Sequence, residues 1–255
     1  MGRDPRRMID LTWEEFRDRA SSSIVIVPLG AVEQHGPHLP LDTDMVVPES
    51  LALAVAERLP VIVAPGFAYG YKSQPNTGGG ERFPGTTSFD GATFIACVRD
   101  IVRQLINQGV RSVALLNGNY ENTYFGIEGI DLALRDVGRP LGVKALLVNW
   151  WEQLEATDLD PIFDGAFPGW EAEHASVVET SLMLHLDPSR VEIDRIPVPA
   201  RIPLPTYTTL PEPPGLVPAS GVLSTAAGST AAKGAALTER LVDSITRILQ
   251  REFPS

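Results

Sequence analysis

Cysteine is almost absent from this sequence: Cys97 is the one cysteine among 255 residues. One cysteine cannot form a disulfide within the chain, which excludes a disulfide-stapled scaffold, and we expect Cys97 to be an inert residue of the core. Long apolar runs are absent as well, since none approaches the roughly 20 residues that a membrane-spanning helix needs. The positive charges near the start are not followed by the apolar stretch of a secretory signal. We therefore expect a cytoplasmic protein with no membrane partner.

Positive charge is also in short supply. Lys and Arg together number 21 against 32 Asp and Glu, which gives a formal net charge of −11. An acidic surface repels the phosphates of nucleic acids and of anionic lipids, so we expect neither as a partner. Hydrophobic residues make up 44% of the chain, an ordinary share for a protein that buries a core, and this excludes wholesale disorder.

Short apolar segments rich in β-branched residues alternate with segments of helical periodicity. The predicted strands are residues 24–29, 61–64, 112–116 and 143–150. The predicted helices are residues 46–59, 90–107, 124–135 and 230–251. Strands that are apolar on both faces and separated by helices are typical of a parallel sheet covered on both sides. We therefore predict an α/β fold, a three-layer sandwich around a mostly parallel sheet, with residues 1–255 as a single domain.

Two segments interrupt this alternation. Residues 68–88 form a Gly- and Pro-rich stretch, and ordered loops of such length usually have a function. Residues 196–219 contain eight prolines, which predicts an extended segment on the surface that covers a sheet edge or a neighbouring subunit.

Residue types that bind metals follow the first predicted strand. Glu33, His35 and Asp44 lie within one short segment, and Glu121 follows the third predicted strand. Ligands of open α/β sheets bind at the carboxyl ends of the strands, where both segments are expected. Carboxylates and imidazoles suit Zn²⁺ or Mn²⁺, and a carboxylate can bridge two ions. The alternative is that these are polar loop residues that cap a helix.

At these segments the sequence resembles the creatininase family of metal-dependent amidohydrolases. The resemblance covers four stretches in order along the chain, at residues 29–44, 65–91, 117–134 and 169–184. The Tyr120–Glu121 pair points to creatininase proper, because many relatives, including peptidase-like and deformylase-like members, carry Gly-Gly there.

The resemblance implies a binuclear site with two divalent ions, Zn and/or Mn. Glu33 and Asp44 would hold the first ion, and His35, Asp44 and Glu121 the second, with Asp44 bridging. The family adds a His to the first ion, and that position is Asn119 here.

An amide oxygen is a weaker and harder ligand than imidazole, so an Asn119 ligand would favour lower occupancy and Mn²⁺ over Zn²⁺. Three explanations of Asn119 stay open: a change that blunts activity, a natural ligand variant with looser metal binding, or the mark of a different reaction. His38 is the nearest other imidazole in the sequence that could replace the missing ligand.

The resemblance also implies the residues that meet the substrate. Trp170 and His174 are four residues apart, which predicts that they share one face at the beginning of a helix. His174 would be the proton shuttle, and Trp170 would close over a flat ring together with Trp151. Tyr120 belongs to the same expected substrate site, and Thr77 begins a glycine run that lets the backbone approach a small ligand. The alternative is a structural histidine and a tryptophan core.

These residues predict the hydrolysis of a small cyclic amide, most simply creatinine to creatine. Metal-activated water would attack the carbonyl, with Glu121 and His174 as the catalytic residues. One alternative is a relative that acts on another amide or a lactam. The other is a catalytically impaired variant or a binding protein, as Asn119 would allow. The resemblance further implies a small-molecule substrate and a homo-oligomer, a hexamer.

Overall fold

Four parallel strands form the middle layer of the fold. In the computed structural model, which describes residues 2–163, 165–198 and 205–254, the strand order is β2-β1-β3-β4. The strands are β1 (Ile24–Leu29), β2 (Val61–Val63), β3 (Ser112–Asn117) and β4 (Lys144–Asn149). Leu29 pairs with Asn117, and Asn117 pairs with Asn149, so β1, β3 and β4 end level with one another. The predicted parallel sheet is confirmed.

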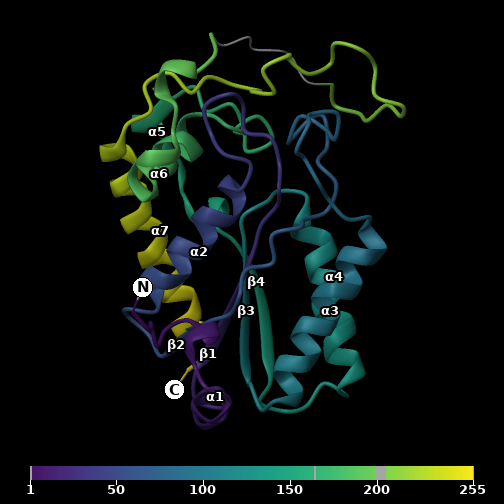
Figure 1. The fold of residues 1–255 in the computed structure, drawn as a ribbon, viewed down its shortest axis with the longest axis vertical. Helices are drawn as coiled ribbons and strands as arrows, with labels where there is room; N and C mark the ends of the chain where they lie inside the picture. Colours follow the sequence, from purple (N-terminus) through teal and green to yellow (C-terminus); the bar gives the residue numbers. More distant parts are fainter. Residues whose placement is uncertain (1, 164, 199–204, 255) are drawn as a thin grey trace.

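Helices cover both faces of this sheet (Figure 1). The α-helices are α1 (Trp13–Ala20), α2 (Thr43–Val55), α3 (Gly91–Asn107), α4 (Asn122–Asp136), α5 (Ala156–Phe163), α6 (Val177–Leu186) and α7 (Ala231–Glu252). Short 3₁₀ segments occupy Met8–Asp10, Trp151–Gln153, Pro188–Arg190 and Ile193–Arg195. Helices α2, α6 and α7 pack on one face, whereas α1, α3 and α4 pack on the other. The predicted three-layer α/β sandwich is therefore confirmed.

Alternate side chains of each strand enter two separate cores. In β1, Ile24 and Ile26 join the core under α2, α6 and α7, while Val25 and Val27 join the core under α3 and α4. Successive side chains of a strand point to opposite faces, and here both faces are covered. This is why β1 reads as a continuous apolar run.

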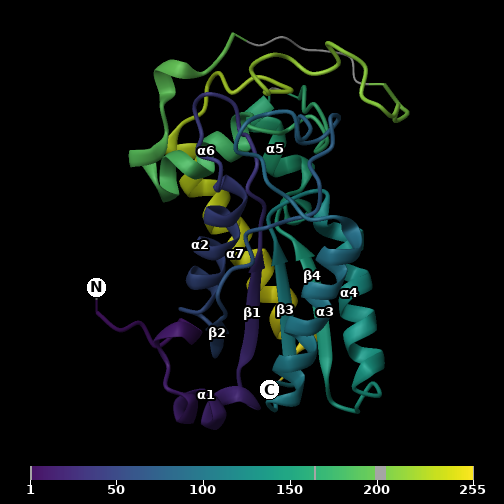
Figure 2. The ribbon, with the colours of Figure 1, turned by 45° about the vertical axis from the view of Figure 1, so that its right-hand side comes forward.

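The loops that follow the strands gather at one end of the molecule (Figure 2). Residues 68–88 contain no helix or strand, as predicted. Of the proline-rich segment, residues 199–204 lie outside the described part. Residues 205–219 form no helix or strand and cross this end of the sheet, where several of them line a cavity.

Three details differ from the sequence-based expectation. The helix expected at Trp170 begins at Val177, because Gly169 (φ +90°) and Ala175 (φ +55°) turn the chain before it. Cys97 lies on α3 but is partly exposed, so it is not a core residue. Helix α2 spans Thr43–Val55, so it begins three residues before the expected start and ends four residues before the expected end at position 59.

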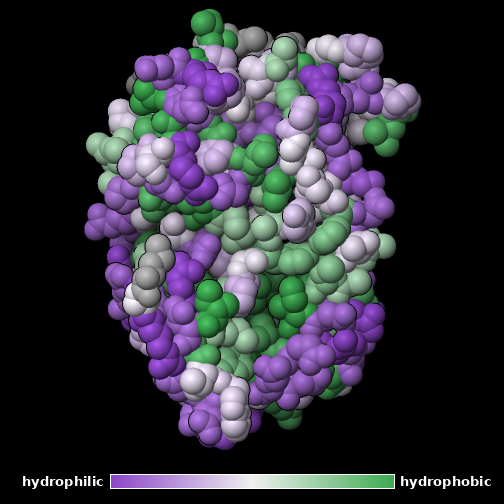
Figure 3. Space-filling view, viewed as in Figure 1, coloured by the Kyte–Doolittle hydropathy of each residue, from purple (hydrophilic) through white to green (hydrophobic). Residues whose placement is uncertain are grey.

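A groove lies away from the collected loops, between the segment that follows β2 and helix α3. It has a volume of about 550 Å³, and Ala64, Phe67, Ile101 and Leu105 are among its lining residues. Apolar side chains, drawn in green, gather in the middle of this face (Figure 3). Asp100 is the one titratable residue among those that line the groove, so the groove lacks the clustered carboxylates and imidazoles found at the end of the molecule where the loops gather. No helix in the described part of the chain is long and apolar enough to cross a membrane.

Candidate metal centre

The carboxyl ends of β1 and β3 bring together the residues predicted to bind metal. Glu33 and His35 follow β1, Asp44 lies in the first turn of α2, and Asn119 and Glu121 stand between β3 and α4. The first four are buried, with exposed fractions of 1–4%, and Glu121 is half-buried. Side chains separated by up to 88 residues in sequence therefore meet because parallel strands end at the same edge.

Two glycines allow this close approach. A Cβ on Gly118 would lie 2.1 Å from the backbone oxygen of Asp44, so any larger residue would push β3 and α2 apart. A Cβ on Gly78 would lie 1.8 Å from Oε1 of Glu33. The glycine at position 118 thus places Asn119 beside Asp44, and Gly78 leaves room for the Glu33 carboxylate.

His35 faces two carboxylates. Its Nε2 lies 3.0 Å from Oδ1 of Asp44 and 3.7 Å from Oε2 of Glu179, a residue of α6. Its Nδ1 donates to the backbone oxygen of Glu33 at 3.1 Å, which leaves the lone pair of a neutral ring on Nε2. The lone pair of Nε2 and the two carboxylates repel one another unless a cation, either a proton or a metal ion, lies between the imidazole and the carboxylates.

The chemistry of these donors fits a divalent ion. Two groups have ligand atoms that all lie within 4.8 Å of one another, Glu33–His35–His174 and His35–Asp44–Glu179. Within the described residues, Nε2 of His35 and Oε1 of Glu33 are buried without a hydrogen-bond partner. Mixed imidazole and carboxylate donors suit Zn²⁺ and Mn²⁺.

Asn119 presents its amide nitrogen to the carboxylates. Nδ2 donates to Oε2 of Glu33 at 3.0 Å and to Oδ2 of Asp44 at 3.2 Å. Oδ1 accepts the backbone N–H of Glu121 at 2.9 Å. The predicted role of Asn119 as an oxygen ligand stays a prediction, and in this arrangement the oxygen points away from the carboxylates.

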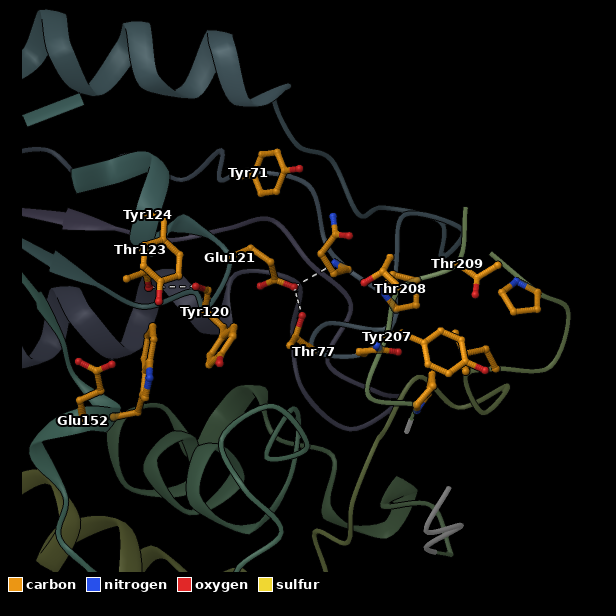
Figure 4. A pocket seen from close by; sticks show the side chains of 17 residues that line it. Tyr71, Thr77, Tyr120, Glu121, Thr123, Tyr124, Glu152, Tyr207, Thr208 and Thr209 are labelled. Carbon is orange, nitrogen blue, oxygen red and sulfur yellow. Dashed lines mark hydrogen bonds between the residues drawn. The ribbon is translucent and has the colours of Figure 1, made fainter. Parts of the chain in front are cut away.

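Glu121 lies at the boundary between this cluster and an outer cavity. Its Oε1 accepts the backbone N–H of Gln74 at 2.9 Å and a hydrogen bond from the hydroxyl of Thr77. Figure 4 shows the Glu121 and Thr77 side chains pointing toward each other, joined by this hydrogen bond. Thr77 thus orients the carboxylate that was predicted to bind the second ion.

His174 lies against His35, with ring centroids 4.4 Å apart. Its Nε2 is 2.7 Å from the backbone oxygen of Gln34, an acceptor, so this nitrogen carries the proton and Nδ1 keeps the lone pair. The amide of Gln34 already donates to the oxygens of Gly78 (3.0 Å) and Gly221 (2.9 Å). His174 is therefore held as the neutral tautomer whose Nδ1 can accept a proton.

Burial and mutual repulsion shift the pKa values of this cluster. Burial, together with the charges of Glu121 and Asp44, raises the pKa of Glu33 well above its ordinary range. Burial raises the pKa of Glu121 to about 7, although hydrogen bonds from Thr77 and Gln74 oppose this. Burial and the charge of His35 lower the pKa of His174 to about 3, so this ring is neutral at ordinary pH. A cluster that resists losing its protons is one that a divalent cation stabilises.

Two cavities meet at Glu121. The inner one, of about 40 Å³, is lined by every predicted site residue except His35. These lining residues are Glu33, Asp44, Thr77, Asn119, Tyr120, Glu121, Trp151, Trp170 and His174. The outer cavity, of about 550 Å³, is lined by Thr77, Tyr120, Glu121 and Trp151 together with described residues of the proline-rich segment. The structure therefore brings the predicted catalytic and substrate residues to one place.

The predicted closure of Trp151 and Trp170 over a flat ring stays a prediction, and two further aromatic side chains contact these tryptophans. Tyr120 stacks on Trp151 with ring centroids 5.9 Å apart and an interplanar angle of 27°. Trp150 makes edge contacts with both Trp151 and Trp170, at 5.9 and 6.2 Å. Trp150 was not singled out from the sequence, yet it lies between the two expected tryptophans.

Comparison with known proteins identifies the family. The family described as creatininase, creatinine amidohydrolase, matches residues 9–249. The creatinine amidohydrolase of Pseudomonas putida is 41% identical over 251 residues, covering 96% of each chain. A solved structure of a mutant creatininase complexed with creatine has a TM-score of 0.95 at 39% identity, covering 98% of this chain and 99% of the other. The chain belongs to the creatininase family.

Family membership confirms the resemblance, the fold class and the prediction of an amidohydrolase. Solved creatininases with a TM-score of 0.95 or 0.94, at 39% and 40% identity, are described as the Mn form and as a Zn-Zn type mutant. The creatininase family also contains other activities. The mycofactocin precursor peptide peptidase of Mycobacterium tuberculosis is 31% identical over 247 residues, covering 92% of this chain and 88% of its own.

Proposed function

We propose that this chain hydrolyses creatinine to creatine with divalent metal ions. One observation carries the proposal: a buried carboxylate and imidazole cluster opens onto an aromatic-lined cavity beside a neutral histidine. The creatinine amidohydrolase of Pseudomonas putida and the creatine-bound relative support this choice of substrate.

The cavity suits a small flat ring. The inner space of about 40 Å³ has room for a few water-sized groups, which limits the part of a substrate that reaches the cluster. Indole and phenol faces at Trp151, Trp170 and Tyr120 line it. Such faces stack on planar, guanidine-like ligands and attract their positive charge, so they favour creatinine over a linear formamide.

Two divalent ions, Zn and/or Mn, would be held by residues already described. We assign the first ion to Glu33 and Asp44, beside Asn119, and the second ion to His35, Asp44 and Glu121. Glu179 lies close enough to His35 to assist the second ion. When bound, these ions supply Lewis-acid activation of water and stabilise negative charge on the substrate oxygen.

His174 would move the proton in this reaction. Its Nδ1 accepts a proton from the attacking water, and the same proton then passes to the ring nitrogen as the C–N bond breaks. The attacking oxygen becomes part of the carboxylate of creatine, and the freed nitrogen keeps the proton. Gln34 fixes the tautomer of His174, as described above. Glu179 accepts the backbone N–H of Ala175 at 2.6 Å and so holds the turn that carries the histidine.

Three further assignments complete the proposal. Residues 1–255 act as one catalytic domain, the chain assembles into a homohexamer, and the enzyme works in the cytoplasm on a small molecule without a nucleic-acid or membrane partner. Closed homo-oligomers are the ordinary form of soluble assemblies.

A larger amide is the alternative substrate. The outer cavity of about 550 Å³ offers more space than creatinine needs, and the peptidase relatives act on a peptide precursor. The two substrates make different demands on the outer cavity, since a peptide would occupy it and creatinine would leave it to solvent.

Creatinine turnover tests the proposal. The purified protein, with and without added Mn²⁺ or Zn²⁺, is assayed for creatine formation by chromatography beside the Asn119→His variant. Short peptides and a linear formamide serve as competing substrates. We expect metal-dependent creatine formation by the parent protein and faster turnover by the variant. Rapid turnover of another amide, with creatinine untouched, would replace creatinine as the substrate.

A further inference from the structure

The side-chain amide of Asn119 stands between two acidic groups. Its Nδ2 donates to Glu33 at 3.0 Å and to Asp44 at 3.2 Å, and Asn119 is only 2% exposed. Hydrogen bonds from a donor to ionised oxygens are roughly twice as strong as neutral ones. The amide therefore offers these two carboxylates part of the positive charge that a cation between them would offer.

The orientation of this amide is fixed from the other side. Oδ1 accepts the backbone N–H of Glu121 at 2.9 Å, and a flipped amide would set its nitrogen against that donor. The backbone of Asn119 is pinned as well. Asn117 accepts its N–H at 3.2 Å and donates to its carbonyl at 2.8 Å. Turning the amide oxygen toward the carboxylates would break three hydrogen bonds at once.

We propose that the Asn119 amide competes with the first metal ion for the Glu33 and Asp44 carboxylates, so that two divalent ions bind with separate affinities. The inference rests on the two-ion centre assigned under the proposed function. The ion beside His35 binds first, because that imidazole already faces Asp44 without a hydrogen-bond partner. The ion beside Glu33 binds second, because it must displace two hydrogen bonds.

This proposal and a ligand role for Asn119 predict opposite effects of Asn119→Ala on the affinity for the first ion. If Asn119 ligates the first ion, then Asn119→Ala removes a ligand and weakens the binding of that ion. If Asn119 competes with the ion, the same change removes the competitor and strengthens the binding. The competitor also stabilises the metal-free protein, because Glu33 and Asp44 lose their donor when the amide is removed.

The experiment titrates the metal-free full chain with Mn²⁺ and counts the free ion by electron paramagnetic resonance. We expect one tight ion per chain in the parent and a second ion at least tenfold weaker. In Asn119→Ala the second dissociation constant should fall by about tenfold, and in Asn119→His the two constants should approach each other. Asn149→Ala is the matched control, since Asn149 lies in the same amide network but contacts neither carboxylate: its Oδ1 accepts from Asn117 and Thr123, and its backbone oxygen accepts from Gln153. The two Mn²⁺ dissociation constants of Asn149→Ala should stay within about twofold of those of the parent.

Thermal unfolding in EDTA gives a readout that involves no metal and no turnover. Asn119→Ala should unfold roughly 5 °C below the parent, by loss of two buried hydrogen bonds. Two equal constants in the parent, or a weaker second ion in Asn119→Ala, would overturn the inference. If the two separate dissociation constants were found but creatinine was not hydrolysed, the proposed function would be wrong and this inference would stand.

Discussion

In the absence of divalent ions, the contribution of Glu121 to the stability of the folded protein should decrease as the pH rises. Glu121 has a pKa of about 7 in the folded protein, against an ordinary value of 4.5, because the carboxyl is buried. The folded state therefore holds the proton more tightly than the unfolded state. The resulting stability is fully present below pH 4.5 and is lost as the pH rises through 7.

The size of this contribution follows from the shift. A difference of about 2.5 pKa units corresponds to about 3 kcal/mol of unfolding free energy, at about 1.36 kcal/mol per unit. Other groups in the cluster also titrate: the pKa of Glu33 is raised and acts in the same direction, whereas the pKa of His174 is lowered to about 3 and acts in the opposite one. The contribution of Glu121 must therefore be isolated by a variant.

Glu121→Gln supplies that variant, because its amide oxygen can still accept from Gln74 and Thr77 but cannot ionise. Urea unfolding of both proteins in EDTA at pH 4.5, 6 and 8 gives the difference in free energy at each pH. We expect the variant to gain about 3 kcal/mol on the parent between the lowest and highest pH. Added Mn²⁺ should stabilise the parent at pH 8 more than the variant, because the variant lacks the Glu121 carboxylate assigned to the second ion. Parallel pH profiles in EDTA would refute the assigned burial of this carboxylate.

Two further changes test the catalytic and packing roles. His174→Ala should lower kcat by about 10²- to 10⁴-fold and leave the metal content unchanged, while His185→Ala, an exposed control on α6, keeps full activity; loss of an ion would make His174 a ligand. Gly118→Ala should destabilise the fold by about 1–3 kcal/mol in urea and reduce metal binding, because its Cβ would lie 2.1 Å from the backbone oxygen of Asp44; an unchanged unfolding midpoint would contradict that contact.

The sheet and its long helices could be predicted because their signals are local. The run Ile24–Leu29 is apolar throughout, and both of its faces are covered. The turn before α6 could not be predicted in the same way. Trp170 and His174 have helical spacing, but Ala175 adopts a positive φ of 55°, in a turn whose N–H is held by Glu179 from the following helix. Spacing identifies residues that could share a face and does not show that the chain between them is helical.

The candidate site could be located from sequence, but its internal contacts could not. Glu33, His35 and Asp44 lie close together in the chain, and Glu121 follows a neighbouring strand, so the general rule for sheet ends brings them together. Glu179 reaches His35 from a helix 144 residues later, and no local pattern marks it as a ligand. A glutamate beside Val177, Val178 and Leu182 on one predicted helix was the available signal, since a charged residue in such surroundings is seldom buried without a partner.

The orientation of Asn119 shows that a residue-by-residue carry-over from a family identifies a position but does not fix which atom of its side chain faces the site. Sequence comparison marks position 119 as a ligand position and offers the amide oxygen as the weaker replacement. The folded chain uses that oxygen to satisfy the N–H of Glu121 and turns the nitrogen toward the acids. An imidazole nitrogen with a lone pair and an amide N–H make opposite electrostatic demands on the same two carboxylates. If the amide competes with the first ion as proposed, position 119 sets how much positive charge the cluster still needs, and the affinity for the second ion to bind follows from that need.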